Sequence, residues 1–273
     1  MKIHSAAILD PEARLAEDVE VGPGVTIEGP AIIGAGCVLQ AHAVITGAVR
    51  LGKNNMVGYG AVLGAAAQDL GSRPETRSEV IIGDGNTIRE YCTIHKGASE
   101  GSVTRVGNGN FLMVGAHLGH NVSLGNNVVI ANNALLGGYV QVGDGAFLGG
   151  GSVYHQHTRV GQLAIAQGNS GFSKDIPPFT VAAEVNFVVG LNIVGMRRAG
   201  FSPEQRREVK DAFKLLYKSG LNIRQALERA REREWREHGR VFFDFVASAG
   251  KRGVCALKER ATTKDGNGGA DGD

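Results

Sequence analysis

VGNGNFLMVGAHLGHNVSLGNNVVIANNALLGGYVQVGDGAFLGG, residues 106–150, repeats with a period of six. Every sixth residue is aliphatic, the residue two places before it is usually small or β-branched, and glycine often follows it. The aliphatic positions are Val106, Leu112, Leu118, Leu124, Ile130, Leu136, Val142 and Leu148. An amphipathic helix has a period near 3.6 and a half-buried strand a period of 2, so a period of six matches neither alone.

The same step continues on both sides of this stretch. Toward the N-terminus it runs through Leu15, Val21, Ile27, Ile33, Leu39, Ile45, Leu51, Val57 and Leu63, and it returns at Ile82, Ile88 and Ile94. Toward the C-terminus it weakens at Tyr154, Val160 and Ala166. The phase slips by one between residues 65 and 80, and Glu100 stands where an aliphatic residue is due. We therefore expect loops to leave the repeat near residues 65–80 and 96–104.

This repeat indicates short strands joined by tight turns. Glycine tolerates the positive φ that such turns require, which accounts for the glycine after many aliphatic positions. One unit cannot bury its aliphatic side alone, so the units must stack into a solenoid with a continuous core. The 41 glycines and the aromatic content of only 6% also favour narrow, regular packing. The sequence therefore predicts a parallel β-helix.

The sequence changes character at DIPPF, residues 175–179, which ends the repeat. Ser202 is a candidate N-cap for a helix. The apolar residues that share one face of this helix are Val209, Phe213, Leu216 and Tyr217. We predict a β-helix over residues 1–186, an α-helical domain over 187–261 and a disordered tail over 262–273.

Charge is unevenly distributed, although the net charge is only +2. Residues 197–260 hold 17 basic and 9 acidic side chains, whereas residues 1–196 hold 11 basic and 15 acidic ones. A basic module on an acidic body favours an anionic partner, but an arginine-rich solvated helix face has the same composition.

Several features bear on the compartment. Cys37, Cys92 and Cys255 have no CxxC spacing, so we expect buried thiols in a reducing environment. No apolar run approaches the roughly 20 residues of a membrane span, and residues 1–11 lack a signal-peptide pattern. We therefore expect a cytoplasmic protein without stable membrane insertion.

Histidines are concentrated in one region, since four of the eight are His117, His120, His155 and His157. A lone histidine is more often a satisfied polar side chain than a catalyst, but this grouping favours function. An imidazole titrates near neutral pH, so it suits removal of a proton from a weak nucleophile such as a sugar hydroxyl.

Seven segments carry motifs more specific than the bare repeat. They are AAQDL (66–70), REYCTIHKG (89–97), LMVGAHLGH (112–120), IANN (130–133), HQ (155–156), DIPP (175–178) and GLNIVGMRRAG (190–200). In this order, over nearly the whole chain to about residue 260, they resemble the bacterial UDP-N-acetylglucosamine acyltransferases that begin lipid A synthesis. The resemblance implies an all-β, left-handed parallel β-helix followed by a small α-helical domain.

In that family three hexapeptides form one coil, so residues 18 apart lie above one another. This register would place His120, Gly138 and Gln156 along one groove. By the resemblance, His120 matches the general base, and we expect it to face solvent in a cleft. Gly138 matches the donor of a hydrogen bond to the oxyanion of the tetrahedral intermediate.

Eight further positions match substrate-binding residues: Gln68, Asp69, His117, His155, Gln156, Gly168, Asn192 and Arg198. Gln68 and Asp69 match loop residues that reach the sugar and the acyl chain from a neighbouring subunit. Asn192 and Arg198 match residues that hold the nucleotide, and an arginine suits its phosphates. A small residue such as Gly168 matches the position that leaves room for the far end of a long acyl chain.

The resemblance also implies partners and a reaction. The chain would form a homotrimer, take a 3-hydroxyacyl or other acyl group from acyl carrier protein and transfer it to the glucosamine 3-position of UDP-N-acetylglucosamine. Acyl carrier protein is acidic and would meet the basic helical domain. No cofactor, no metal and no nucleic acid are implied.

Some positions depart from the family pattern. Tyr139 replaces a histidine, Asn121 an aspartate and Gly71 a lysine, while Val194 and Ala199 replace a glutamate and an arginine. These changes leave a second acceptor open, the 3-amino analogue of the sugar nucleotide, which would give an N-acyl product.

The repeat is also compatible with two different functions. One is that of a zinc-binding hexapeptide-repeat homologue, for which His117 and His120 could supply two ligands, although the usual His-x4-His spacing is absent. The other is that of a non-catalytic scaffold on the same fold. A later N-acyltransferase of the same pathway fits less well, because it normally carries an additional N-terminal domain.

Overall fold

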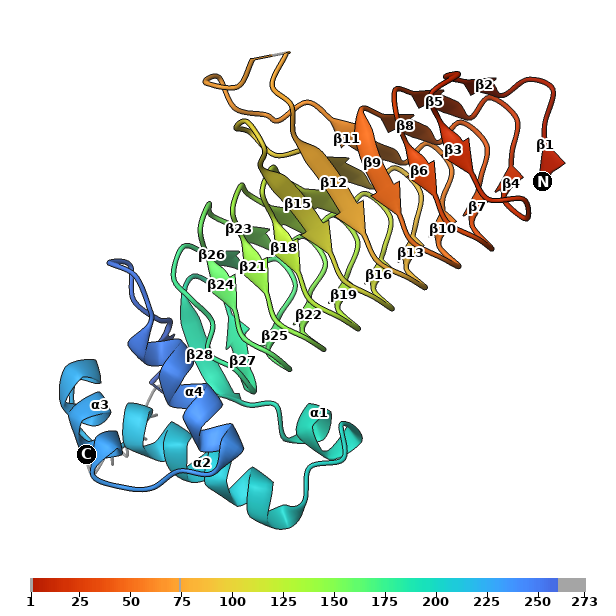
Figure 1. Cartoon of the computed structure of the whole chain (residues 1–273). Coiled ribbons are helices and arrows are strands. Elements are labelled where there is room, and N and C mark those ends of the chain that lie inside the picture. The colour runs from red at the N-terminus through yellow and green to blue at the C-terminus, as the bar shows by residue number, and fades with distance from the viewer. Residues whose placement is uncertain (1, 74, 260–273) are drawn as a thin grey trace, which may run out of the picture.

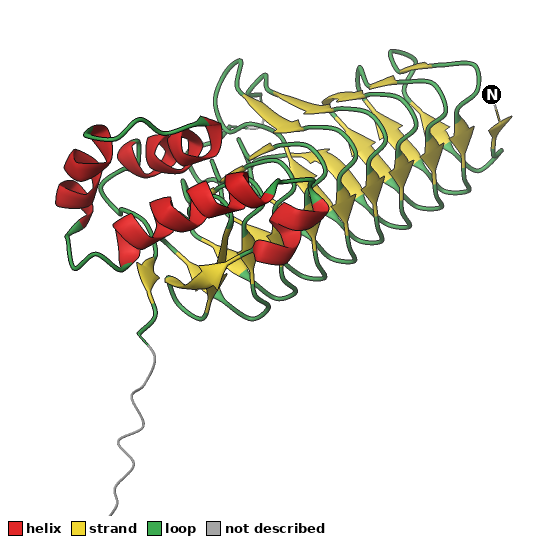
Figure 2. Cartoon of the chain, turned by 90° about the horizontal axis from the view of Figure 1, so that it is seen from below, coloured by secondary structure: helices red, strands yellow, loops and turns green. Residues whose placement is uncertain are grey.

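The computed structural model describes residues 2–73 and 75–259; the tail predicted for residues 262–273 lies outside them. The chain winds through three parallel sheets that form the sides of a triangular prism (Figure 1). Helices gather at the C-terminal end of the prism (Figure 2). This architecture confirms the predicted left-handed parallel β-helix with a small helical part.

We name the three sides face A, face B and face C. Face A contains β1 (Lys2–Ile3), β4 (Glu20–Val21), β7 (Val38–Leu39), β10 (Met56–Val57), β13 (Thr87–Ile88), β16 (Phe111–Leu112), β19 (Val129–Ile130), β22 (Phe147–Leu148), β25 (Ile165–Ala166), β27 (Thr180–Ala183), β28 (Phe187–Leu191) and β29 (Ala256–Leu257). Face B contains β2 (Ile8–Leu9), β5 (Thr26–Glu28), β8 (Val44–Thr46), β11 (Val62–Ala65), β14 (Thr93–His95), β17 (His117–Leu118), β20 (Leu135–Leu136), β23 (Val153–Tyr154) and β26 (Gly171–Phe172). Face C contains β3 (Arg14–Leu15), β6 (Ile32–Ile33), β9 (Ala48–Leu51), β12 (Glu79–Ile82), β15 (Val103–Val106), β18 (Ser123–Leu124), β21 (Gln141–Val142) and β24 (Arg159–Val160).

The interior is filled by the residues that define the period of six. Those positions and the small residues two places before them are almost all buried in one continuous core. Each coil is 18 residues long where no loop interrupts it, as in the pairing of His117 with Leu135. Burying an aliphatic side chain stabilises the fold by about 1.5–3 kcal/mol, so each added coil increases the stabilising free energy of the core.

Two loops interrupt the coils near the predicted places. Met56 pairs with Thr87, 31 residues on, because the chain leaves the prism between β11 and β12. Thr87 pairs with Phe111, 24 residues on, because a second loop lies between β14 and β15. The second loop adds one repeat length, so the period of six passes through it without a change of phase.

The glycines after the aliphatic positions have a different cause from the one expected. Most of them do not have positive φ. A Cβ on Gly34 would lie 2.5 Å from the Gly52 carbonyl oxygen of the next coil. Positive φ occurs two residues further on, at positions that also accept non-glycine residues such as Asn121 and Tyr139. Close stacking of the coils, rather than turn conformation, therefore selects these glycines.

The helical part contains α1 (Ile193–Arg198), α2 (Pro203–Tyr217), α3 (Ile223–Arg231) and α4 (Glu237–Ala247). Capping boxes at Ser202 and Asn222 begin α2 and α3. The helices enclose a second core built on Phe179, Met196 and Phe242. Residues 187–191, assigned from sequence to the helical domain, instead form β28, which pairs antiparallel with β27.

Arg159 fastens the helices to the prism. Its guanidinium lies 2.7 Å from the Asp175 carboxylate, donates to the Phe245 carbonyl of α4 at 3.0 Å and stacks over the Phe245 ring. The described residues include no helix long and apolar enough to cross a membrane. All three cysteines are buried free thiols, as expected, and burial raises the pKa of Cys92 to about 11.

Gly34→Ala should lower the free energy of unfolding by about 1–3 kcal/mol, because the added methyl group strikes the backbone of the next coil. Gly190→Ala is the matched control, since a Cβ there meets no atom within 4 Å. Thermal or urea unfolding of both variants checks this. Equal stability of the two variants would contradict the explanation by close stacking.

Candidate active site

The corner between face B and face C gathers three of the predicted site residues in one column. His120, Gly138 and Gln156 follow β17, β20 and β23 in successive coils. The Tyr139 amide donates to the His120 carbonyl at 2.9 Å, and the His157 amide donates to the Gly138 carbonyl at 3.0 Å. Residues 18 apart therefore lie about 4.8 Å apart along this corner.

Gly138 faces the ring of His120. A Cβ on Gly138 would lie 2.5 Å from both Cε1 and Nε2 of His120, closer than real Cβ atoms approach. Among the described residues no hydrogen bond uses the Gly138 amide N–H. Glycine at this position therefore leaves a ring nitrogen and a peptide donor side by side, without a side chain between them.

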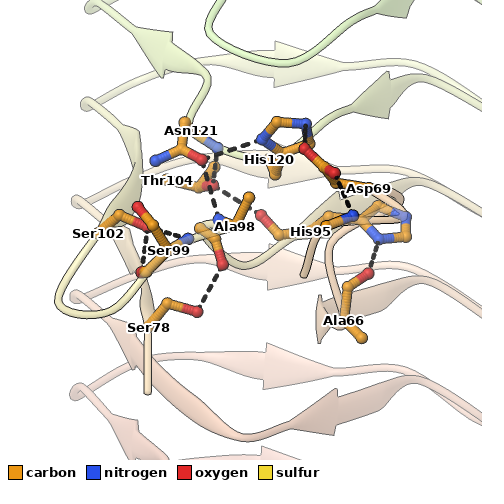
Figure 3. A network of polar contacts seen from close by, with 12 residues as sticks. Ala66, Asp69, Ser78, His95, Ala98, Ser99, Ser102, Thr104, His120 and Asn121 are labelled. Carbon is orange, nitrogen blue, oxygen red and sulfur yellow. Dashed lines mark hydrogen bonds and ion pairs between the residues drawn. The ribbon is translucent and has the colours of Figure 1, made fainter. Parts of the chain in front are cut away.

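The surroundings of His120 fix its tautomer. Its Nδ1 lies 3.0 Å from Oδ1 of Asn121, and the same oxygen accepts the backbone N–H of Ala98 at 2.9 Å (Figure 3). Because the Ala98 N–H can donate only to an acceptor, the Asn121 side-chain atom beside it is the oxygen and not the nitrogen. His120 Nδ1 must then donate to this oxygen, so Nδ1 carries the ring proton. In the neutral ring the lone pair is therefore on Nε2. This atom is buried, has no hydrogen-bond partner within the described chain and lies 3.8 Å from an Asp69 carboxylate oxygen.

A loop covers His120, contrary to the expectation that this residue faces solvent. Only 3% of the side chain is exposed, and the loop between β11 and β12 brings Asp69 over it (Figure 3). The ring nevertheless lies outside the aliphatic interior. Leu118 and Val122, two residues before and after His120 in the sequence, are the side chains that point into that interior. In one chain, this loop therefore covers Nε2.

The second loop braces the same corner. The backbone N–H of Asn121 donates to Oγ1 of Thr104 at 2.8 Å, and the Thr104 hydroxyl donates to the His95 carbonyl at 2.7 Å (Figure 3). Ser78 Oγ donates to the Gly97 carbonyl at 2.6 Å. The orientation of Asn121, and through it the tautomer of His120, therefore depends on this loop.

His117 and His95 lie next to each other beside the column. His117 Nδ1 is 2.8 Å from the Thr93 hydroxyl, and the two imidazole rings are 5.1 Å apart. Burial, and secondarily the charge of His95, lowers the pKa of His117 to about 4. His95 Nδ1 donates to the Ala66 carbonyl at 2.6 Å, which ties His95 to the loop that carries Asp69.

The sequence motifs do not distinguish His95 as a site residue. Only alternation along β14 points to it, because Thr93 and His95 both turn away from the buried Ile94. Its position between the covering loop and His117 became evident only from the structure.

The other predicted residues divide among different places. His155 precedes Gln156 on the same corner as His120, two coils along, and Gln68 is exposed on the loop beside Asp69. Gly168 lies on the corner between faces A and B, where a Cβ would be 3.0 Å from the Gly150 carbonyl oxygen.

Asn192 and Arg198 lie at the third corner, between faces C and A. Asn192 caps α1, because its Oδ1 accepts the Gly195 amide at 2.8 Å, and its Nδ2 donates to the Leu163 carbonyl at 2.8 Å. Arg198 is exposed in the last turn of α1. Within one chain, neither these residues nor Gly168 are brought to His120.

No group of three or more His, Cys, Asp or Glu side chains in residues 2–73 and 75–259 is placed to hold a metal ion.

Comparison with known proteins gives the same family over most of the chain. The chain is 44% identical over 229 residues, 83% of its length, to the acyl-(acyl-carrier-protein)–UDP-N-acetylglucosamine O-acyltransferase of Halorhodospira halophila, and the match covers 88% of that protein. The chain belongs to the UDP-N-acetylglucosamine O-acyltransferase family. Models of this family's second domain match residues 175–255, and models of the bacterial transferase hexapeptide match residues 12–47 and 104–138.

Solved structures of the family agree with the fold. The UDP-N-acetylglucosamine acyltransferase of Francisella novicida superposes with a TM-score of 0.90 at 33% identity, covering 94% of each chain. The enzyme of Bacteroides fragilis superposes with a TM-score of 0.87 at 36% identity, covering 92% of this chain and 99% of that one.

One departure from the family pattern lies against the candidate base. The Tyr139 ring packs edge-on against His120 at 5.2 Å and stacks on His157 at 4.6 Å. A histidine here would lack the phenol, so this chain presents a different surface beside Gly138.

The lowered pKa of His117 predicts a titration well below that of an ordinary histidine. NMR of histidine-labelled protein should give a midpoint of about 4 rather than 6.5. The unfolded ring takes up a proton more readily than the folded one, so the stability that this neutral ring contributes is complete above pH 6.5 and is lost as the pH falls toward 4. A His117 midpoint near 6.5 would contradict the assigned burial.

Proposed function

We propose that this chain transfers an acyl group from acyl carrier protein to the glucosamine 3-position of UDP-N-acetylglucosamine, the first step of lipid A biosynthesis. The observation that carries the proposal is the placement of His120 Nε2, which has no hydrogen-bond partner in the described part of the chain, against Gly138 in the next coil. The named activity of the relatives supports the same reaction.

His120 and Gly138 divide the chemistry between them. Nε2 of His120 removes the proton from the sugar hydroxyl as its oxygen attacks the thioester carbonyl. The Gly138 N–H donates to the oxyanion of the tetrahedral intermediate. When the intermediate collapses, the carbon–sulfur bond breaks and the imidazolium returns its proton to the leaving thiolate. The Asp69 carboxylate beside Nε2 favours the transient positive charge.

We also propose a homotrimer, because the three outer faces differ in polarity. Beyond the first two coils, outward-facing apolar residues line face A, including Val38, Phe111, Val129, Phe147 and Ile165. Face B presents Val44, Val62, Leu135 and Val153. Face C is mostly polar and presents Arg14, Arg50, Arg105, Ser123 and Gln141. Packing face B of one copy against face A of the next would cover both apolar faces in a closed ring of copies. The resemblance to the family sets the number of copies in this ring at three.

This arrangement joins the separated residues. The corner that carries His120 would lie beside the neighbour's corner that carries Asn192 and Arg198, and the Gly168 corners would meet near the threefold axis. We therefore propose that the base and oxyanion donor come from one subunit and the nucleotide-binding residues from the next.

The acyl donor would approach the helical part. Lys210, Lys214 and Lys218 lie exposed at intervals of four residues along and just beyond α2, which forms a basic surface suited to an acidic carrier protein. The three unpaired thiols fit a reducing compartment, so we propose that the reaction takes place in the cytoplasm.

Product analysis tests the proposed reaction. Purified protein, acyl carrier thioesters and UDP-N-acetylglucosamine should yield the O-acyl sugar nucleotide, identified by mass. A parallel reaction with the 3-amino analogue measures the N-acylation suggested by Tyr139, Val194 and Ala199. Absence of acyl transfer to either acceptor would refute the proposal.

His120→Ala should lower kcat by about 10²- to 10⁴-fold, because it removes the general base. His4→Ala makes the same chemical change on an exposed histidine of the first coil and should leave kcat unchanged. Circular dichroism and the oligomeric mass should match between the two variants. Near-normal turnover in His120→Ala would show that another group takes the proton.

Phe147→Asp should dissociate the trimer, because it places a charge in the proposed contact of face A, where Phe147 is 39% exposed in one chain. Gln141→Asp, on the neighbouring strand of face C, should leave the trimer intact. Light scattering distinguishes the two. If Phe147→Asp remained a trimer, or if only Gln141→Asp dissociated, the interface would lie on other faces than proposed.

A further inference from the structure

A segment remote in sequence reaches the catalytic corner. The chain after α4 turns at Gly253 and is pinned to the prism, because the Asp175 amide donates to the Gly253 carbonyl at 3.0 Å and the Cys255 amide donates to the Asp175 carbonyl at 2.8 Å. Arg159 holds the other side of Asp175 and the end of α4. This connection gives the turn a defined position at the end of the coils.

Arg252 extends from this turn to the corner. One nitrogen of its guanidinium, Nη1, donates to the Gln156 carbonyl at 2.6 Å and lies 2.7 Å from Nδ1 of His155. The guanidinium thereby contacts two of the predicted site residues, one coil from Gly138. Nothing in the sequence motifs points to Arg252, which is 97 residues from His155.

An arginine side chain has no acceptor atom, so in its contact with a ring nitrogen the arginine must donate and the ring nitrogen must accept. Nη1 carries two hydrogens, one for the Gln156 carbonyl and one for His155 Nδ1, and Nδ1 must accept. The opposite tautomer, with Nδ1–H donating to the Gln156 carbonyl at 3.2 Å, would direct a second hydrogen into the 2.7 Å gap beside Nη1. The shorter contact therefore decides the tautomer.

We propose that Arg252 is a positioning residue of this site, which holds neutral His155 as the Nε2–H tautomer. The exposed His155 then presents an Nε2–H donor two coils further along the prism than His120. The groups it suits are acceptors such as the amide carbonyls of an acyl donor's pantetheine-type arm, whose thioester lies at Gly138. The choice of ligand rests on the proposed acyl transfer, whereas the tautomer does not.

Nitrogen NMR of the full-length protein tests the tautomer without an activity measurement. At a pH where His155 is neutral, Nδ1 should have the shift of an unprotonated ring nitrogen and Nε2 that of a protonated one. The signal is assigned with His155→Gln. Arg252→Met should shift the population toward the other tautomer, and Arg252→Lys, which keeps one donor, should shift it less. A protonated Nδ1 in the unmodified protein would overturn the proposal even if the variants failed to fold.

Kinetics tests the consequence for the donor. Arg252→Met should raise KM for the acyl carrier thioester by roughly 2- to 10-fold, the worth of one ordinary hydrogen bond, with little change in kcat or in KM for the sugar nucleotide. Lys251→Met removes a neighbouring exposed cation and controls for general attraction of an acidic donor. Equal changes in both variants, or an unchanged KM in Arg252→Met, would refute the contact with the donor. Loss of all transfer in the unmodified protein would instead refute the proposed function and leave the NMR result valid.

Discussion

Close stacking of 18-residue coils is the constraint on which this molecule depends. The coils approach so closely that at many positions after the interior aliphatic residues a Cβ would strike the backbone of the next coil, as at Gly34. Because the interior is filled by aliphatic side chains, the side chains that carry chemistry lie at the corners and on the outer faces. Each corner then becomes a column in which a spacing of 18 in sequence is about 4.8 Å in space. The pair of His120 and Gly138 follows directly from this geometry.

Hydrogen bonds between neighbouring segments also fix the orientation of the His120 ring. The ring of His120 is oriented by Asn121, whose amide oxygen is assigned by the Ala98 N–H, and Ala98 belongs to the loop that Ser78 and Thr104 brace. The family pattern has an aspartate at this position. The neutral Asn121 still fixes the tautomer, and the Asp69 carboxylate on the covering loop lies 3.8 Å from Nε2.

Much of this could be predicted from the sequence, and the failures have identifiable causes. The period of six reports interior packing, so it located the strands of the coils. The column of His120, Gly138 and Gln156 followed from the 18-residue register that the family resemblance implies. A loop one repeat long leaves the phase intact, so the loop between β14 and β15 was indicated only by Glu100 at a position where an aliphatic residue is due. Positive φ was assigned to the wrong glycines, because a period identifies a recurring position without saying whether space or conformation selects it. The cover over His120, the place of His95 and the reach of Arg252 depend on loops and tertiary contacts that no repeat encodes.

The most direct test of the account is complementation between two inactive variants. His120→Ala damages one corner and Arg198→Ala damages another, and in the proposed trimer these corners belong to neighbouring subunits and form one site. Coexpressed in equal amounts, the two chains should form mixed trimers in which one site of the three is intact. Trimers of a single variant have no intact site, so about a quarter of all sites are intact and transfer activity should return to that level. Activity no higher than that of either variant alone, in mixed trimers verified by mass, would contradict a site shared between subunits.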